Sequence, residues 1–349
     1  MFPTLNVVSV TQARVPRLRS AAMPEPSRHA RVAVVCGGPA AEREVSLASG
    51  REVAAALRAS FDDVTVHEPG LQLAVELMGG SIDVVFPALH GPLGEDGSIQ
   101  GMLEVAGVPY VGSGVAASAC AMDKVLAKRL FRDAGLPLAR EVVIERHEAA
   151  GAAARVRAAL PGRVAVKPAT QGSALGVAFA ETGDQLEAAL DDAFRFDEKV
   201  LVEEFVVGSE ITVGILEAPE PQPFPVIDIR TPGDSWYDFE HRYAAGLSEH
   251  VIPAPLPPDV YASVQELAVH AHVTLGCRDL SRVDFVVEPG GRIVLLEVNT
   301  LPGMTPTSLY PDGAQAAGIS FEQLVEQLVR RALSRAPARD EARTAPPAA

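Results

Sequence analysis

The chain has 349 residues, of which 48% are apolar, enough to build more than one hydrophobic core. It carries 30 Lys and Arg against 45 Asp and Glu, which gives a formal net charge of −15. This acidic balance argues against a nucleic-acid partner, because such proteins need a concentrated basic face. No apolar run is long enough to cross a bilayer, so we expect no membrane partner.

The three cysteines, Cys36, Cys120 and Cys277, are far apart and have apolar neighbours. Their spacing matches neither a metal site nor a disulfide framework. We therefore expect three buried, reduced thiols in a cytoplasmic protein.

The first structured region alternates strands with helices. Its expected elements are strands at Arg31–Cys36, Val64–His67 and Asp83–Pro87 and helices at Arg43–Ala59 and Leu71–Met78. This order predicts a parallel sheet with helices on its faces. Ligands of such sheets bind beyond the carboxyl ends of the strands, where the polar loops 42–44 and 90–97 lie.

The rest of the chain predicts further mixed α/β structure without an internal repeat. The expected elements are helix Asp123–Ala134, strand Glu141–Glu145, helix Glu148–Leu160, strands Arg163–Lys167 and Val177–Ala180, helix Asp184–Phe194, strands Lys199–Glu204, Glu210–Leu216 and Val226–Ile229, helix Asp259–Leu275 and a closing hairpin. A polar stretch, Thr231–Glu249, interrupts the last third of the chain.

Composition and pattern divide the chain into five parts. We expect a disordered N-terminal extension (1–29), a parallel-sheet domain (30–112), two further α/β regions (113–204 and 205–333) and a disordered tail (334–349).

The closing hairpin carries the clearest pattern. Gly290 and Gly291 can supply the two positive-φ residues of a tight primed turn between the strands. A turn centred there places Asp284 opposite Glu297. The same register pairs Arg282 with Asn299 and puts all four side chains on one face. The opposite, apolar face would comprise Val283, Phe285, Leu296 and Val298.

Two carboxylates facing each other in a sheet repel, and a divalent cation between them removes that cost. The oxygen ligands of Asp284, Glu297 and Asn299 suit Mg²⁺, which also takes phosphate oxygens and water. The alternative is a solvated face with an acidic pair. We favour the metal site because Arg282 and Asn299 complete a polar face.

Three further segments suit a nucleotide. Lys167 ends an apolar strand and precedes the glycine-containing loop 171–176, whose backbone N–H groups could approach phosphate oxygens. Lys124 begins a helix, and the apolar strand 200–206 contains two acids that could face adenine and ribose. Taken singly, each is equally compatible with an ordinary loop, a surface lysine or a charged strand end.

Three single residues are informative only in combination. His90 could be a structural histidine, Glu42 a helix-start acid favoured by the helix dipole, and Ser308 a helix cap.

Taken in chain order, these segments resemble the D-alanine–D-alanine ligases of the ATP-grasp superfamily, from about Arg31 to about Leu333. The segments that carry the resemblance are Gly37-Gly38 with Ala41–Ser46, Ala88–Gly91, Gly94–Gly97, Met122–Lys124, Val166–Pro168, Tyr237–Glu240, Arg282–Asp284 and Leu296–Thr305. Many ATP-grasp enzymes share the metal hairpin, whereas the Glu42 loop, the His-Gly segment and the Pro-Gly-Met-Thr segment are more specific to this family.

The resemblance implies a fold and a reaction. The fold is an N-terminal parallel-sheet, Rossmann-like domain followed by a two-part ATP-grasp domain of antiparallel sheets with helices. The reaction transfers the ATP γ-phosphoryl group to the carboxylate of one D-alanine. The amine of a second D-alanine then attacks the acyl phosphate, for peptidoglycan precursor synthesis. A homodimer is implied on the same basis.

The resemblance also assigns site residues. Two Mg²⁺ (or Mn²⁺) ions would be held by Asp284, Glu297 and Asn299. ATP would be bound by Lys124, Lys167, Ser173, Glu203, the Val206 backbone, Glu210 and Arg242. The two D-alanine molecules would be bound or oriented by Glu42, His90, Ser173, Tyr243, Arg282, the Gly303 N–H, Ser308 and the Leu309 N–H.

Three positions depart from the family pattern: Phe239 replaces a Tyr, Arg242 a Lys, and Ala174 a Ser. Two alternatives therefore stay open, namely another ATP-grasp ligase and a catalytically weak nucleotide-binding protein. The intact polar set on the hairpin argues against the second. Tyr243 favours the dipeptide over the D-alanyl-D-lactate ester.

Overall fold

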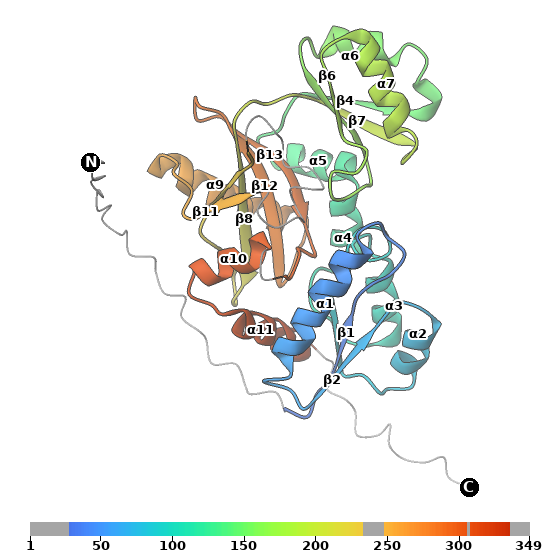
Figure 1. Ribbon diagram of the computed structural model, residues 1–349, viewed down its shortest axis with the longest axis vertical. Coiled ribbons are helices and arrows are strands. Elements are labelled where there is room, and N and C mark those ends of the chain that lie inside the picture. The colour runs from blue at the N-terminus through green and yellow to red at the C-terminus, as the bar shows by residue number, and fades with distance from the viewer. Residues whose placement is uncertain (1–27, 233–247, 306–307, 336–349) are drawn as a thin grey trace, which may run out of the picture.

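The computed structural model describes residues 28–232, 248–305 and 308–335 and has a mixed α/β architecture with three sheets (Figure 1). Most of the predicted extension and tail, and most of the polar stretch 231–249, lie outside these residues. Within the described part, no helix is long and apolar enough to span a membrane.

The first sheet is parallel, as the sequence predicts, and has the order β2-β1-β3. Its elements, in the lower part of Figure 1, are β1 (Arg31–Val35), α1 (Arg43–Leu57), β2 (Asp63–His67), α2 (Leu71–Met78), β3 (Val84–Pro87) and α3 (Ser98–Ala106). The Ser46 hydroxyl accepts from the Gly37 N–H (2.7 Å) and donates to the Ala88 carbonyl (2.6 Å). These bonds fix the start of α1 against the ends of β1 and β3.

The two faces of this sheet bury alternate residues, as expected for a sheet covered on both sides. Val32 and Val34 pack with α1 and with α11 (Phe321–Ser334), whereas Ala33 and Val35 pack with α2 and α3. The last described helix of the chain therefore completes the core of the first sheet.

The second sheet is antiparallel, with the order β4-β7-β5-β6. Its elements are β4 (Glu141–Glu145), a 3₁₀ turn (Arg146–Glu148), α6 (Ala152–Ala159), β5 (Val164–Pro168), β6 (Ala178–Ala180), α7 (Gly183–Ala193) and β7 (Lys199–Glu204). The helix expected from Glu148 begins only at Ala152, because the 3₁₀ turn precedes it and Gly151 adopts φ 76°. Helices α6 and α7 cover one face of the sheet.

The third sheet has six strands, and its longest pairing joins β8 to β12. Its strands are β8 (Ser209–Glu217), β9 (Pro221–Pro223), β10 (Ile227–Arg230), β11 (Glu249–Val251), β12 (Leu280–Val287) and β13 (Ile293–Asn299). Helices α5 (Lys124–Asp133) and α9 (Pro258–Thr274) pack on one face. The other face is polar.

Several elements were not predicted. They are α3, α4 (Val115–Met122), α10 (Leu309–Ala316), α11 and the short strands β9 and β11. Helix α4 is alanine-rich and lacks a clear apolar stripe, so its sequence carries no helical period.

The hairpin of β12 and β13 confirms the predicted pairs and corrects the turn. Asp284 faces Glu297 and Arg282 faces Asn299. The turn is a three-residue loop closed by the Glu288 N–H and the Arg292 carbonyl (2.9 Å), and of its glycines only Gly291 has positive φ.

The same hairpin contains a register shift after Asp284, where Phe285 pairs with Leu295. Leu296 is the extra residue of this bulge. Its predicted place in the core is therefore wrong. Leu295 is buried in the core instead, and Leu296 lines a cleft on the polar face.

The cysteines match the prediction in two of three cases. Cys36 and Cys277 are buried, whereas Cys120 is only partly buried. Helix α4 presents Cys120 at the edge of the core beneath the third sheet.

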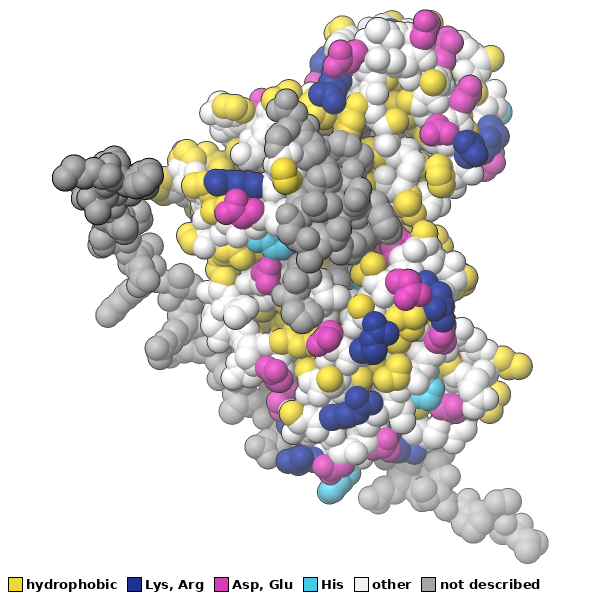
Figure 2. Space-filling model, viewed as in Figure 1, with side chains coloured by type: hydrophobic (Ala, Val, Ile, Leu, Met, Phe, Trp, Pro, Cys, Tyr) yellow, Lys and Arg dark blue, Asp and Glu magenta, His cyan; other side chains and the backbone are white. Residues whose placement is uncertain are grey.

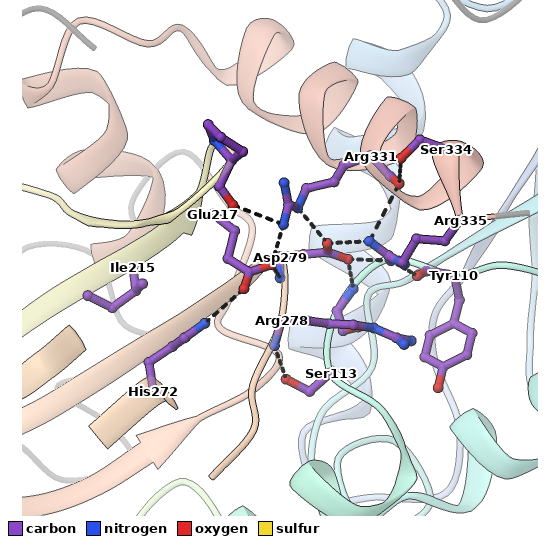
Figure 3. A network of polar contacts seen from close by, with 12 residues as sticks. Tyr110, Ser113, Ile215, Glu217, His272, Arg278, Asp279, Arg331, Ser334 and Arg335 are labelled. Carbon is purple, nitrogen blue, oxygen red and sulfur yellow. Dashed lines mark hydrogen bonds and ion pairs between the residues drawn. The ribbon is translucent and has the colours of Figure 1, made fainter. Parts of the chain in front are cut away.

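A buried carboxylate fastens α11 to the rest of the molecule (Figure 3). Asp279 is fully buried and accepts hydrogen bonds from the Gly112 N–H (2.8 Å), Arg331 Nε (3.0 Å) and Arg335 Nη2 (2.6 Å). The Asp279 N–H donates to Glu217 at 2.9 Å. This network joins the end of β8, the start of β12 and the segment that leaves the first sheet.

The surface agrees with the expectation of no nucleic-acid partner. On the coloured part of the face in Figure 2, Lys and Arg side chains lie beside Asp and Glu and do not form one basic patch.

Candidate active site

A cleft of about 280 Å³ lies between the second and third sheets. Its walls are the face of the second sheet that α6 and α7 do not cover and the polar face of the third sheet. The lining includes Lys124, Lys167, Gln171, Ala174, Glu203, Val206, Glu210, Leu296 and Glu297. Most residues predicted to contact ATP therefore lie along one cavity.

One end of the cleft is apolar. It is lined by Ala139, Ala165, Phe179, Phe205, Val286 and Leu296. Phe179 and Phe205 meet edge to face at 5.1 Å, and the Arg163 guanidinium lies 4.1 Å from the Phe205 ring. This end suits a flat, weakly polar ring such as a purine.

The polar face of the hairpin forms one bonded cluster. Arg282 donates from Nε and Nη2 to the two Asp284 oxygens at 2.9 and 2.7 Å, and Thr212 donates to Oδ1 at 2.6 Å. The Asn299 amide nitrogen donates to Asp284 Oδ2 at 3.1 Å, so the amide oxygen is turned away from that carboxylate. Arg282 and Thr212 together neutralise and orient the acid.

The donor set on this face fits Mg²⁺. It offers two facing carboxylates, Asp284 and Glu297, and the amide oxygen of Asn299. In the described ranges, no group of three or more His, Cys, Asp and Glu side chains has metal-binding geometry, so any metal here depends on an amide as third protein ligand.

Glu203 lies between two lysines and is 2% exposed. Its Oε2 is 2.6 Å from Lys167 Nζ, and its Oε1 is 2.6 Å from Lys128 Nζ. Burial alone would raise the pKa of Glu203, but the two ammonium groups outweigh it and hold the pKa at about 2. The carboxylate is therefore ionised at neutral pH.

Lys124 connects the glycine-containing loop to the metal face. Its Nζ donates to the Gln171 carbonyl at 2.6 Å and lies 3.5 Å from Glu297 Oε2. The Asp123 side chain caps the helix that Lys124 begins, at 3.0 Å from the Val125 N–H. This cap fixes where the lysine enters the cleft.

Glu42 reaches the same loop from the first sheet. It is 2% exposed, and its carboxylate lies so close to two glycines that a Cβ on Gly91 would be 2.9 Å, and one on Gly172 3.2 Å, from an oxygen. The next residue in that loop is Ser173, with φ 48°. The structure thus brings the predicted Glu42 and Ser173 segments together although they are far apart in sequence.

His90 and Glu95 line the approach from the first sheet. Burial, and then the charge of Arg282, lowers the pKa of His90 to about 4, and its Nε2 has no hydrogen-bond partner among the described residues. Burial raises the pKa of Glu95 to about 7, although the Gly91 N–H donates to it at 2.7 Å. His90 is therefore neutral and has an unpaired ring nitrogen.

The segment after β13 places the last predicted residues. A Cβ on Gly303 would lie 2.9 Å from Ser308 Oγ, and the Thr305 N–H donates to that oxygen at 3.1 Å. The Met304 N–H donates to Ser49 of α1 at 3.3 Å. Leu309 is the first residue of α10, where backbone N–H groups lack partners within the helix.

Two predicted residues, Arg242 and Tyr243, lie outside the described part of the chain. Three residues at the site were not singled out from the sequence: Lys128, Glu95 and Thr212. Lys128 carried a usable signal, because it lies three residues from Val125 and from Phe131 on the apolar side of α5.

Comparisons with known proteins agree with this geometry. The family model described as the D-ala D-ala ligase C-terminus matches residues 130–330, and the model of the N-terminus matches residues 62–113. Ligases named D-alanine–D-alanine ligase from Desulforamulus reducens and Halalkalibacterium halodurans are 43% and 44% identical to the chain. Each match covers 85% of this chain and 97% of the relative.

Solved structures give the same result. The VanG D-Ala:D-Ser ligase of Enterococcus faecalis superposes with a TM-score of 0.74 at 30% identity, covering 86% of this chain and 98% of that one. The D-alanine–D-alanine ligase of Coxiella burnetii gives 0.75 at 25% identity, covering 88% and 95%. The chain is a member of the D-alanine–D-alanine ligase family.

Proposed function

We propose that this protein joins two D-alanine molecules with ATP, through an acyl phosphate, and releases ADP and phosphate for peptidoglycan precursor synthesis. The observation that carries the proposal is the juxtaposition in one site of a nucleotide-sized cleft, a paired-acid face and the buried Glu42. Phosphoryl transfer needs mainly positioning and charge neutralisation, and these three features supply both.

The nucleotide would lie along the cleft. Its adenine would occupy the apolar end, held by Glu203 and the Val206 backbone, with the ribose at Glu210. Lys124 and Lys167 would bind the α- and β-phosphates, near the Ser173 loop. Arg242 would lie near the γ-phosphate, on the basis of the family resemblance alone.

The metal face completes the phosphate site. Asp284, Glu297 and Asn299 would hold two Mg²⁺ or Mn²⁺ ions. When bound, these ions neutralise phosphate charge during transfer.

The first D-alanine would enter beside the first sheet. Glu42 would pair with its ammonium group, and the neutral His90 would offer its unpaired Nε2 as an acceptor. Tyr243 and Ser173 would complete a network with Glu42. Held in this way, the substrate carboxylate would attack the γ-phosphorus and ADP would leave.

The second D-alanine would bind at the start of α10. Ser308 and the Leu309 N–H would receive its carboxylate, as helix N-termini do for anions. Its amine would attack the carbonyl carbon of the acyl phosphate. Arg282 and the Gly303 N–H would stabilise the resulting oxyanion until phosphate leaves.

A second candidate concerns only the second substrate, since one similar structure is a D-Ala:D-Ser ligase. The test is phosphate release from Mg-ATP with D-alanine alone and then with D-serine or D-lactate added, with products identified by mass. We expect D-alanyl-D-alanine as the main product in each mixture. A mixed product in excess would show a different second-substrate site, and ATP binding without D-alanine-dependent release would point to a nucleotide-binding protein.

The family resemblance also leads us to propose a cytoplasmic homodimer. Sedimentation of the purified protein would measure the oligomeric state.

A further inference from the structure

Lys128 has no role in the proposed reaction, yet it is among the most deeply buried charged side chains of the described chain. It is 1% exposed and lies on α5 among apolar residues. Its Nζ is 2.6 Å from Glu203 Oε1 and 3.4 Å from the Leu295 carbonyl. A lysine is rarely buried unless it is paired, so Glu203 accounts for its position.

Glu203 therefore has two cationic partners of different accessibility. Lys167 holds Oε2, has 17% of its side chain exposed and lines the cleft. Lys128 holds Oε1, has 1% of its side chain exposed and lies behind the cleft wall. A phosphate in the cleft can reach the Lys167 ammonium group but not that of Lys128.

We propose that Lys128 is a positioning residue that keeps the Glu203 carboxylate paired while Lys167 turns to the nucleotide phosphates. The inference rests on the proposed function, because it needs an adenine nucleotide in the cleft. With Lys128 in place, Lys167 can leave Glu203 without stranding a buried carboxylate. Without Lys128, the phosphates compete with Glu203 for a single ammonium group.

This competition predicts a selective loss. Adenosine has no phosphate and can bind while Lys167 stays on Glu203, whereas ADP must draw Lys167 away. In Lys128→Met we therefore expect the affinity for ADP to fall ~10- to 100-fold more than the affinity for adenosine, the range of a charge-assisted hydrogen bond. A packing role alone would weaken both ligands by the same factor.

The measurement is calorimetric titration of the full chain with ADP and, separately, with adenosine. Phe131→Leu is the matched control, because Phe131 is fully buried on the same helix and carries no charge. We expect this control to lower the unfolding temperature and leave the ratio of the two dissociation constants unchanged. Equal weakening of ADP and adenosine in Lys128→Met would overturn the inference alone. Failure of the wild type to bind either ligand would overturn the nucleotide site as well.

A second comparison covers the case in which Lys128→Met does not fold. In Glu203→Gln the carboxylate is gone, so Lys128 has no charge to hold. We therefore expect Lys128→Met, added to Glu203→Gln, to change the ADP-to-adenosine ratio by less than about twofold, the ordinary error of additivity. A tenfold change in that background would contradict a role exerted through Glu203.

Discussion

Asp284→Asn and Glu297→Gln should each lower kcat/KM for D-alanine ligation by ~1000-fold or more, since metal-based charge stabilisation contributes several kcal/mol and each ~1.4 kcal/mol is tenfold. The two acids face each other across β12 and β13, and each substitution keeps shape while removing a charge. Phosphate release at increasing Mg²⁺ concentration measures the effect. We expect both variants to need more Mg²⁺ than the wild type.

The matched control is Glu326→Gln. Glu326 is an α11 carboxylate that bonds Ser60 at 2.7 Å and Arg330 at 2.7 Å, away from the cleft. It should leave both the rate and the Mg²⁺ dependence unchanged. Full ligation by either hairpin variant at the wild-type Mg²⁺ concentration would show that the metal assignment is wrong.

Arg282→Met should lower kcat by ~100- to 1000-fold, the usual loss when one donor to a developing oxyanion is removed. Arg282 is well placed for this role, because it spans both oxygens of Asp284 and its charge lowers the pKa of His90. Methionine keeps the length of the side chain without its charge. Initial-rate measurements with both D-alanine and ATP saturating would isolate kcat.

Arg330→Met is the control for that substitution, since Arg330 pairs with Glu326 on α11. An equal loss of rate in both variants would indicate a general effect of lost charge. A change in KM for D-alanine with unchanged kcat would place Arg282 in substrate binding only.

The paired-acid face could be predicted from the sequence because a hairpin is local. Strand alternation and the position of the turn were sufficient to pair Asp284 with Glu297. The turn itself was misjudged, since two adjacent glycines do not show which one takes positive φ. The bulge that moves Leu296 into the cleft has no signature in an apolar run such as 293–298.

The meeting of Glu42 with the Gly172 loop could not be predicted from residue patterns. It depends on how the first and second sheets are placed, and family resemblance alone suggested it. The packing of α11 on the first sheet is equally non-local, as the bond from Ser60 to Glu326 illustrates across 266 residues. Lys128 could have been found by asking why a lysine lies on the apolar side of a helix.

The most direct test of the proposed reaction is to label the carboxylate oxygens of D-alanine with ¹⁸O and to analyse the released phosphate by mass. If the carboxylate attacks the γ-phosphorus, the bridging oxygen leaves with the phosphate. We therefore expect one ¹⁸O in each phosphate and D-alanyl-D-alanine in equal amount. Unlabelled phosphate would mean that water, and not the carboxylate, accepts the phosphoryl group, and would contradict the proposed mechanism.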